Sequence, residues 1–243
     1  MSQDIWEDFG NQYSQMYKEV EFDLVHGSTA LLVVDVQRKS CDRDIDSGVG
    51  AALKKTYPEL AARFFDRLDV TLPNIRRLVD FFRAHQLPVV FFAVGPALPD
   101  GSDMPATFRQ QYANLNSAGD TDVKVTRDSR GYELIDGLEP RPNELLIHKV
   151  TRSVFCATPT ELALRSMGIR TLVIVGGSTQ TCVASSARHG SDLGFEVVLV
   201  EDACHSVFPE LHGSVMTTHR MGQGRVMSTA DVESELSGST CHR

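Results

Sequence analysis

The chain has 243 residues, of which 42% are hydrophobic and 23% charged, a composition that can bury a substantial core and argues against wholesale disorder. The 24 Lys and Arg residues against 32 Asp and Glu give a net charge of −8, which repels phosphate backbones and argues against a nucleic-acid partner. No apolar run approaches the ~20 residues of a membrane helix, and the acidic first 25 residues do not resemble a signal or transit peptide, so we expect a cytoplasmic protein with no membrane partner.

Residues 1–28 are predicted to be an N-terminal helical extension. Aromatic residues fall there at spacings of three and four, which is typical of one face of an amphipathic helix; they are Trp6, Phe9, Tyr13 and Tyr17. We expect this face to pack on the body of the protein or on another subunit. The remaining residues, 29–243, are expected to form one domain.

Short apolar runs alternate with helical patterns along that domain. The runs that predict buried strands are 30–34, 88–94, 144–148, 172–175, 196–200 and 225–227. Helices are predicted over 71–85, 158–167, 182–194, 209–221 and from 229 onward. Alternating strands and helices imply a parallel sheet covered on both faces. The predicted fold class is therefore α/β, a three-layer α/β/α arrangement around a mostly parallel sheet of about six strands.

Two stretches show neither a helical nor a strand period. Residues 38–57 are predicted to be a long surface loop that covers the site, and residues 95–130 an irregular, largely polar excursion over the carboxyl edge of the sheet. Both carry little recognisable pattern. The sequence therefore does not name a substrate.

Three predicted strands end in chemically active residues. Asp35 follows the first strand, Lys149 ends the third, and a Gly176-Gly177 turn after the fourth leads to Cys182. Because the carboxyl ends of parallel strands share one edge of a sheet, we expect these side chains to converge. Cys182 also opens a predicted helix, where unpaired N–H groups and the helix dipole lower the pKa of a thiol.

The three residue types suit acyl transfer through a thioester. A carboxylate beside a thiol can take its proton as a general base and later return it to a departing amine. An ammonium between them stabilises thiolate and carboxylate together. Backbone N–H groups at the helix start can stabilise an oxyanion. Cys182 is the predicted nucleophile.

The flanks of these residues resemble a known family. ALLVVDVQ around Asp35, HKVTRSVF around Lys149 and GGSTQTCV around Cys182 closely resemble the isochorismatase-like cysteine hydrolases. This group includes nicotinamidases, N-carbamoylsarcosine amidase, and ureidoacrylate and biuret amidohydrolases. The resemblance runs from about residue 29 to the final helix. It implies an Asp–Lys–Cys triad and a homo-oligomer, either a dimer or a tetramer.

The resemblance also implies a particular backbone arrangement before the cysteine. It places a cis peptide bond between Gly177 and Ser178. Its use would be to aim the backbone N–H groups of Ser178 and Cys182 at one oxyanion.

Departures from the family pattern narrow the expected chemistry. Ser40 stands where many members carry an aromatic residue, so stacking of such a ring on the substrate is not supported. Asp42, Asp44 and Asp46 supply oxygens, but no histidine lies nearby, so no metal or other cofactor is predicted. Isochorismatases proper, which hydrolyse a vinyl ether, generally lack the cysteine. Cys182 therefore favours hydrolysis of a C–N bond.

Candidate substrate-binding residues flank the triad. Arg38 and Arg152 each lie three residues beyond a triad member, and a guanidinium fork can bind a carboxylate or carbonyl. Gln37 and Ser40 are further candidates, although Gln37 can equally satisfy backbone groups at the strand end. The expected partners are a small-molecule amide and water.

Several alternatives remain open from the residues alone. His148, His189 or His205 can pair with Cys182, as in Cys–His hydrolases. The same thiol can serve a non-enzymatic redox or interaction protein, and the fold also carries vinyl-ether hydrolases. Dinucleotide binding is disfavoured because the Gly176-Gly177 turn lacks the required glycine spacing. The other cysteines are interpreted as reduced thiols without a role: Cys41, Cys156, Cys204 and Cys241.

The sequence as a whole predicts a cysteine-dependent amidohydrolase. It would cleave a C–N bond of a small amide, ureide or carbamoyl compound through a thioester and release ammonia or an amine.

Overall fold

One six-stranded parallel sheet forms the centre of the molecule. The computed structural model describes residues 18–119 and 125–239. The strand order is β3-β2-β1-β4-β5-β6, and all neighbouring pairs are parallel. The strands are β1 Thr29–Val34, β2 Val89–Val94, β3 Leu145–Lys149, β4 Thr171–Gly177, β5 Glu196–His205 and β6 Arg225–Met227. This confirms the predicted α/β class and strand number, although β5 runs five residues further than predicted.

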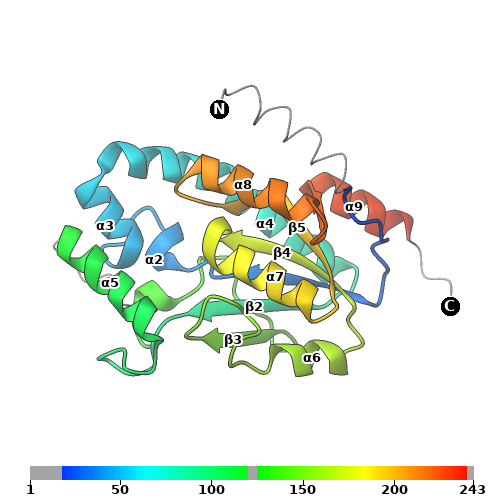
Figure 1. The fold of residues 1–243 in the computed structure, drawn as a ribbon, viewed down its shortest axis with the longest axis horizontal. Helices are drawn as coiled ribbons and strands as arrows, with labels where there is room; N and C mark the ends of the chain where they lie inside the picture. Colours follow the sequence, from blue (N-terminus) through cyan, green and yellow to red (C-terminus); the bar gives the residue numbers. More distant parts are fainter. Residues whose placement is uncertain (1–17, 120–124, 240–243) are drawn as a thin grey trace, which may run out of the picture.

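Helices cover both faces of the sheet (Figure 1). One apolar core lies between the sheet and helices α4 (Pro58–Ala84) and α9 (Thr229–Gly238). A second core lies between the opposite face and helices α6 (Thr160–Ser166), α7 (Ala184–Asp192) and α8 (Pro209–Arg220). Successive residues of a strand point to opposite faces, so strands covered on both sides are apolar throughout. All six residues of β1 are buried accordingly.

The prediction of a long loop over residues 38–57 is wrong. This stretch contains two helices, α2 (Arg38–Cys41) and α3 (Gly48–Thr56). Their packing depends on glycines, because a Cβ at Gly48 would lie 2.6 Å from the Cβ of Lys39. Glycine is a poor helix former, and this weakens the helical pattern in the sequence. The segment does cover the site, as expected.

The predicted start of the next helix at Thr71 is also wrong. Helix α4 begins 13 residues earlier, with Pro58 in its first turn, and carries Pro73 in its interior. An interior proline removes a helical hydrogen bond and normally marks a helix start or a kink. Here the earlier turns bury Phe64, Phe65 and Leu68 against the sheet. That burial outweighs the local cost of Pro73.

The stretch 95–130, which showed no pattern, includes a 14-residue helix. Helix α5 spans Ala106–Gly119, and the short 3₁₀ helix η1 spans Arg130–Tyr132. Helices α2, α3 and α5 lie together at one end of the molecule in Figure 1, beyond the carboxyl ends of the strands. They form a cap over that edge of the sheet.

The described part of the N-terminal region has no helix. Residues 18–28 are irregular up to a turn at its end, which corrects the predicted helical extension for this part. Leu24 is fully buried in the main core, and its N–H donates to Glu235 Oε1 of α9 over 2.8 Å. This segment is thus packed on the domain. The four aromatic residues of the predicted amphipathic face lie outside the described residues.

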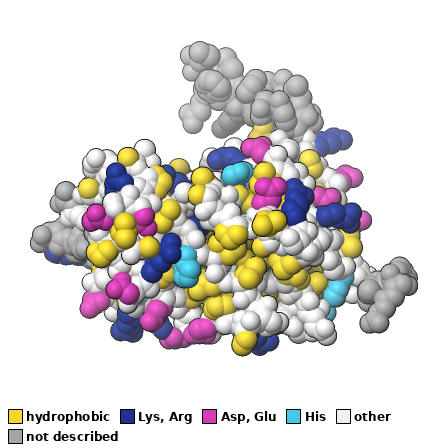
Figure 2. All heavy atoms as spheres, turned by 90° about the horizontal axis from the view of Figure 1, so that it is seen from below, with side chains coloured by type: hydrophobic (Ala, Val, Ile, Leu, Met, Phe, Trp, Pro, Cys, Tyr) yellow, Lys and Arg dark blue, Asp and Glu magenta, His cyan; other side chains and the backbone are white. Residues whose placement is uncertain are grey.

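The surface on the β3 and α6 side mixes apolar and charged groups. Figure 2 shows this face, which lies at the bottom of Figure 1, with apolar side chains gathered between acidic and basic ones. Leu145 and Leu146 of β3 and Leu162 of α6 are among the exposed apolar residues. Within the described residues, no helix is long and apolar enough to cross a membrane. The predicted homo-oligomer stays a prediction.

Candidate active site

The sheet order brings Asp35 and Lys149 together. Asp35 follows β1 with a left-handed backbone (φ 53°), and Lys149 is the last residue of β3. Strand β2 lies between them, so the lysine must reach across about 10 Å, two strand spacings. Its long side chain does so, and Nζ donates to Asp35 Oδ2 over 2.7 Å. Both side chains are buried.

The ammonium of Lys149 is fully used within the protein. Besides Asp35, it donates to the carbonyl oxygens of Thr151 at 3.0 Å and Arg152 at 3.1 Å, so each of its three protons has an acceptor. Burial lowers its pKa, but the charges of Asp35 and Cys182 and the hydrogen bond to Asp35 outweigh this, and the pKa lies above its ordinary value. Lys149 is therefore a fixed cation, not a proton donor.

Cys182 lies where β4 turns into α7. It belongs to a π-helical turn, η2 (Thr179–Val183), a geometry that is frequent at functional sites. Its side chain is 6% exposed and lines a cavity together with Asp35. The expected thiol at a helix start next to two charged partners is present.

The prediction that the helix start lowers the pKa of Cys182 is not supported. Burial raises the pKa of the thiol to about 12, although the Lys149 ammonium lowers it, and the negative charge of Asp35 adds to the rise. Desolvation disfavours the thiolate more than the cation favours it. The resting site thus holds a thiol, which needs a base before it can attack.

Asp35 is placed to act as that base. Oδ2 accepts from Lys149, whereas Oδ1 is buried and has no hydrogen-bond partner within the described residues. A buried acceptor without a partner is costly and often marks a working site. An incoming thiol proton can bind to Oδ1 while Lys149 holds the other oxygen.

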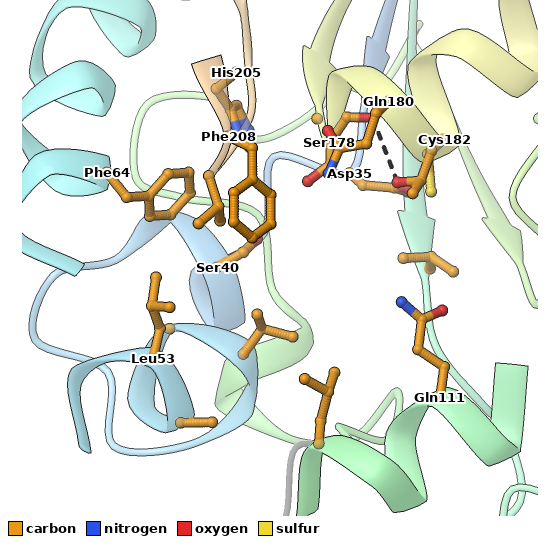
Figure 3. A pocket seen from close by; sticks show the side chains of 18 of the residues that line it. Asp35, Ser40, Leu53, Phe64, Gln111, Ser178, Gln180, Cys182, His205 and Phe208 are labelled. Atoms are coloured by element: carbon orange, nitrogen blue, oxygen red, sulfur yellow. Dashed lines mark hydrogen bonds between the residues drawn. The ribbon is translucent and has the colours of Figure 1, made fainter. Parts of the chain in front are cut away.

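A cavity of about 350 Å³ opens onto these groups. Figure 3 shows Asp35, Ser178, Gln180 and Cys182 on one side and Leu53, Phe64 and Phe208 on another. The wall comes mostly from the cap helices, the start of α4 and the segment after β5, through residues Val49, Leu53, Leu60, Phe64, Phe108, Tyr112, Leu115, Val207 and Phe208. The cavity volume suits a small molecule.

Two of the four candidate substrate residues reach this cavity. Ser40 and Arg152 line it. Arg152 donates from Nη2 to Gln111 Oε1 at 2.9 Å, and its guanidinium carbon lies 4.6 Å from the centre of the Phe108 ring. Ser40 stands where many family members carry an aromatic residue, and other aromatic residues, such as Phe64, line the wall.

The structure does not bring Gln37 and Arg38 into the cavity lining. Both ends of the Gln37 amide are occupied by backbone groups, with Nε2 donating to Tyr132 O at 2.7 Å and Oε1 accepting from Val94 N at 3.0 Å. Arg38 pairs with three carboxylates, those of Asp42, Glu133 and Asp136. Gln37 therefore satisfies backbone groups at the strand end, which is the alternative to the predicted substrate contact.

Sequence reasoning missed Lys39, Gln111 and Gln180. Gln111 and Gln180 line the cavity from α5 and η2. Lys39 is buried outside the cavity lining, donates to Val94 O and packs over the Tyr132 ring. Burial lowers the Lys39 pKa to about 8, while the nearby Asp35 charge opposes the shift. Lys39 and Gln111 depend on cap helices that the sequence did not reveal, whereas Gln180 lies within the GGSTQTCV stretch and was passed over beside Cys182.

The three histidines considered as partners of Cys182 bond elsewhere. His148 Nδ1 lies 2.8 Å from Tyr132 Oη, and His189 Nδ1 lies 3.0 Å from Ser153 Oγ. His205 does line the cavity, but its Nε2 lies 3.6 Å from the sulfur of Cys41. Burial lowers the pKa of His205 to about 4, so its ring is neutral near pH 7.

The backbone before Cys182 has the arrangement implied by the family resemblance. The peptide bond between Gly177 and Ser178 is cis. Gly177 packs directly against the ring of His205, since a Cβ there would lie 2.1 Å from His205 Cε1. Only glycine fits this approach. Ser178 and Cys182 both line the cavity.

The residues suggest no metal centre in the described part of the chain. Over 18–119 and 125–239, no three His, Cys, Asp or Glu side chains cluster in a way that could hold an ion. Asp42 is instead paired with Arg38. Absence of a catalytic metal remains a prediction.

The chain is similar to known proteins. The Isochorismatase domain family model matches residues 29–231. An ureidoacrylate amidohydrolase RutB from Rhizobium rhizogenes is 31% identical over 194 residues, covering 75% of this chain and 72% of the relative. A second RutB, from Pseudomonas syringae, is 31% identical over 199 residues, covering 76% and 73%.

Solved structures show the same fold. A cysteine hydrolase from Pseudomonas syringae pv. phaseolicola superposes with a TM-score of 0.74 at 22% identity, covering 91% of this chain and 98% of that one. An isochorismatase family protein from Desulfovibrio vulgaris gives a TM-score of 0.65 at 23% identity, covering 85% and 97%. The residues matched by the family model include the whole sheet and Asp35, Lys149 and Cys182. The chain belongs to the isochorismatase family.

Proposed function

We propose that the protein is a cysteine-dependent amidohydrolase that cleaves a C–N bond of a small amide, ureide or carbamoyl compound. The predicted enzyme class, a hydrolase of linear amides that are not peptides, agrees with the amidohydrolase names of its relatives. Those relatives are named for ureidoacrylate. The observation that carries the proposal is that Asp35 and Cys182 line one cavity while the buried Lys149 ammonium holds Asp35 from behind.

The first half of the reaction forms a thioester. Asp35 Oδ1 takes the thiol proton, and the sulfur of Cys182 attacks the substrate carbonyl carbon to form a C–S bond. The carbonyl oxygen becomes an oxyanion, for which the backbone N–H groups of Ser178 and Cys182 are the proposed donors. As the C–N bond breaks, the protonated Asp35 returns its proton to the nitrogen, which leaves as ammonia or an amine.

The second half hydrolyses the thioester. Water gives a proton to Asp35 and attacks the same carbonyl carbon. The C–S bond then breaks, the acid or carbamate product leaves, and the sulfur recovers the proton. In each half-reaction Asp35 takes up one proton and gives one up, so the net charge of the site stays constant. The Lys149 ammonium stabilises that charge without giving up a proton.

A matched pair of cysteine variants tests the proposal. In a panel of amides and ureides scored by ammonia release, Cys182→Ala is expected to lower turnover by at least about 10⁴-fold, because the nucleophile is lost. Cys204→Ala is the control, since Cys204 is equally buried but does not line the cavity. It should keep near-normal turnover. Undiminished ammonia release by Cys182→Ala would overturn the cysteine mechanism.

A further inference from the structure

The cavity separates polar and apolar groups. The groups on the side of the reacting atoms are polar: Asp35, Ser178 and Gln180 lie beside Cys182 (Figure 3). The wall contributed by α3, α4 and the segment after β5 is mostly apolar, with Leu53, Phe64 and Phe208 among its side chains, and Ser40 and the neutral His205 lie beside it (Figure 3). A bound amide that places its carbonyl at Cys182 therefore presents its other end to apolar side chains.

Positive charge is scarce on this wall. Arg152 is the one Arg or Lys side chain that lines the cavity within the described residues. Its guanidinium already donates to Gln111 and stacks on Phe108. Lys149 is buried, with its three acceptors supplied by the protein. Lys149 itself does not line the cavity.

Arg38 and His205, which also lie near the site, offer no free positive charge to the cavity. Arg38 is held by three carboxylates and does not line the cavity. His205 lines it as a neutral ring at pH 7, because burial depresses its pKa. A carboxylate on the far end of a substrate would be desolvated against apolar groups, and among the described residues only Arg152, already held by Gln111 and Phe108, could pair with it at the cavity. The wall thus discriminates against anionic substrates.

We propose that the substrate is an amide whose non-reacting end is an uncharged alkyl or aryl group seated against this apolar wall. The inference rests on the proposed function, because it takes the carbonyl of the substrate to lie at Cys182. It assigns this chain to a different substrate class from ureidoacrylate, which carries a carboxylate and gives the curated relatives their name. Each methylene buried on the wall is expected to raise kcat/KM by about fourfold.

Two amides of equal length test the substrate class. Hexanamide and 5-carbamoylpentanoate differ only in that the terminal methyl of the first is a carboxylate in the second. Ammonia release by the wild-type protein is expected to show a kcat/KM at least about tenfold higher for hexanamide. Equal values, or a preference for the carboxylate compound, overturn the inference in favour of an anionic substrate bound by Arg152.

A wall variant and its control locate the effect. Phe208→Ala is expected to lower kcat/KM for hexanamide about tenfold and to leave acetamide, which is too short to reach the wall, nearly unchanged. Leu211→Ala is the control, because Leu211 is 45% exposed against 46% for Phe208 but does not line the cavity. Equal losses for both amides in Phe208→Ala would contradict the wall assignment.

The two proposals can fail separately. If ammonia release survives in Cys182→Ala, the proposed function fails, whichever amide is preferred. If neither amide is hydrolysed, binding is tested instead by alkylating Cys182 with iodoacetamide in the presence of each amide. Mass spectrometry of the Cys182 peptide measures the extent of alkylation. Protection by hexanamide and not by 5-carbamoylpentanoate supports the apolar class. Equal protection, or none from either, overturns it.

Discussion

At the scale of single residues, the pair of Asp35 and Lys149 explains how a buried thiol can work. The carboxylate is available on one oxygen and held by the ammonium on the other. Burial keeps Cys182 protonated at rest, so the base and the nucleophile must act in concert. The same burial protects the resting thiol from unwanted oxidation.

Removing the cation should damage both activity and stability. Lys149→Met leaves the buried Asp35 carboxylate without its partner, which costs about 3–5 kcal/mol of unfolding free energy. Turnover should fall at least about 100-fold, since the base is no longer oriented. Lys54→Met is the control, because Lys54 also donates to two carbonyl oxygens but lies outside the cavity lining. Chemical denaturation and ammonia release measure the two effects, and similar losses in both variants would contradict the role of Lys149.

The raised pKa of Cys182 predicts slow, strongly pH-dependent alkylation. In the free protein, the rate of Cys182 modification by iodoacetamide should rise steadily from pH 7 to 10 without a plateau, because the thiolate population keeps growing toward a pKa of about 12. The exposed Cys156, followed by mass spectrometry in the same sample, corrects for loss of reagent. A plateau below pH 8 would show that the helix start and the Lys149 charge lower the pKa of Cys182 more than burial raises it.

Some site residues could be predicted from the sequence and others could not. Asp35, Lys149 and Cys182 were identifiable because each ends or follows a strand, and parallel strands share their carboxyl edge. Lys39 and Gln111 were not, since their positions depend on α2 and α5. Arg38 illustrates the opposite case. Its place three residues after Asp35 suggested a substrate contact, but one helical turn aims it at acidic neighbours instead.

At the scale of elements, the turn from β4 into α7 is the most constrained part of the site. Gly177 lies against the ring of His205, which ends β5. This contact ties the backbone before Cys182 to the neighbouring strand. The positions of Ser178 and Cys182 therefore depend on a glycine.

Gly177→Ala should disturb this turn. The added Cβ would lie 2.1 Å from His205 Cε1, and such overpacking costs about 1–3 kcal/mol and moves the backbone. We expect a lower melting temperature and loss of most turnover. Gly213→Ala in α8 is the matched control, because a Cβ there meets nothing within 4 Å, and alanine favours a helix. Thermal unfolding compares the two; an equal melting temperature for Gly177→Ala would contradict the contact.

The elements that sequence patterns missed share one physical property. Helix α3 packs on α2, α4 and α5, and the apolar residues of α3 and α5 line the cavity rather than the sheet, so neither follows the strand–helix alternation that marks the core helices. Helix α4 was recognised only in its second half, because Pro73 mimicked a helix start. The sheet itself was predictable, since strands covered on both faces are continuous apolar runs.

At the scale of the whole molecule, histidines in buried or partly buried positions make the folded protein less stable at acid pH. Burial lowers the pKa of His205 to about 4 and the pKa values of His212 and His219 below the ordinary 6.5. Above pH 6.5 these side chains are neutral in both the folded and the unfolded state, and their contribution to stability is fully present. That contribution is lost as the pH falls from 6.5 through the folded-state values. For His205 the loss amounts to about 3 kcal/mol.

The unfolding free energy should accordingly fall between pH 6.5 and 4. His219→Gln removes one of these groups, and its amide can still donate to the carbonyl of Val197, which the His219 ring contacts at 3.2 Å. Its stability should depend less on pH in this range than that of the wild type. His85→Gln, at an exposed position, should keep the full dependence. Urea denaturation at several pH values measures this, and identical slopes for all three proteins would refute the assignment.

The covalent intermediate is the most direct test of the account as a whole. With the amide that releases ammonia fastest, acid-quenched protein should carry the acyl group on the Cys182 peptide in mass spectrometry, and added hydroxylamine should divert the product to a hydroxamate. The account predicts both, and predicts that Asp35→Asn shows neither. Steady turnover with an unmodified Cys182 peptide and no hydroxamate would contradict the thioester mechanism.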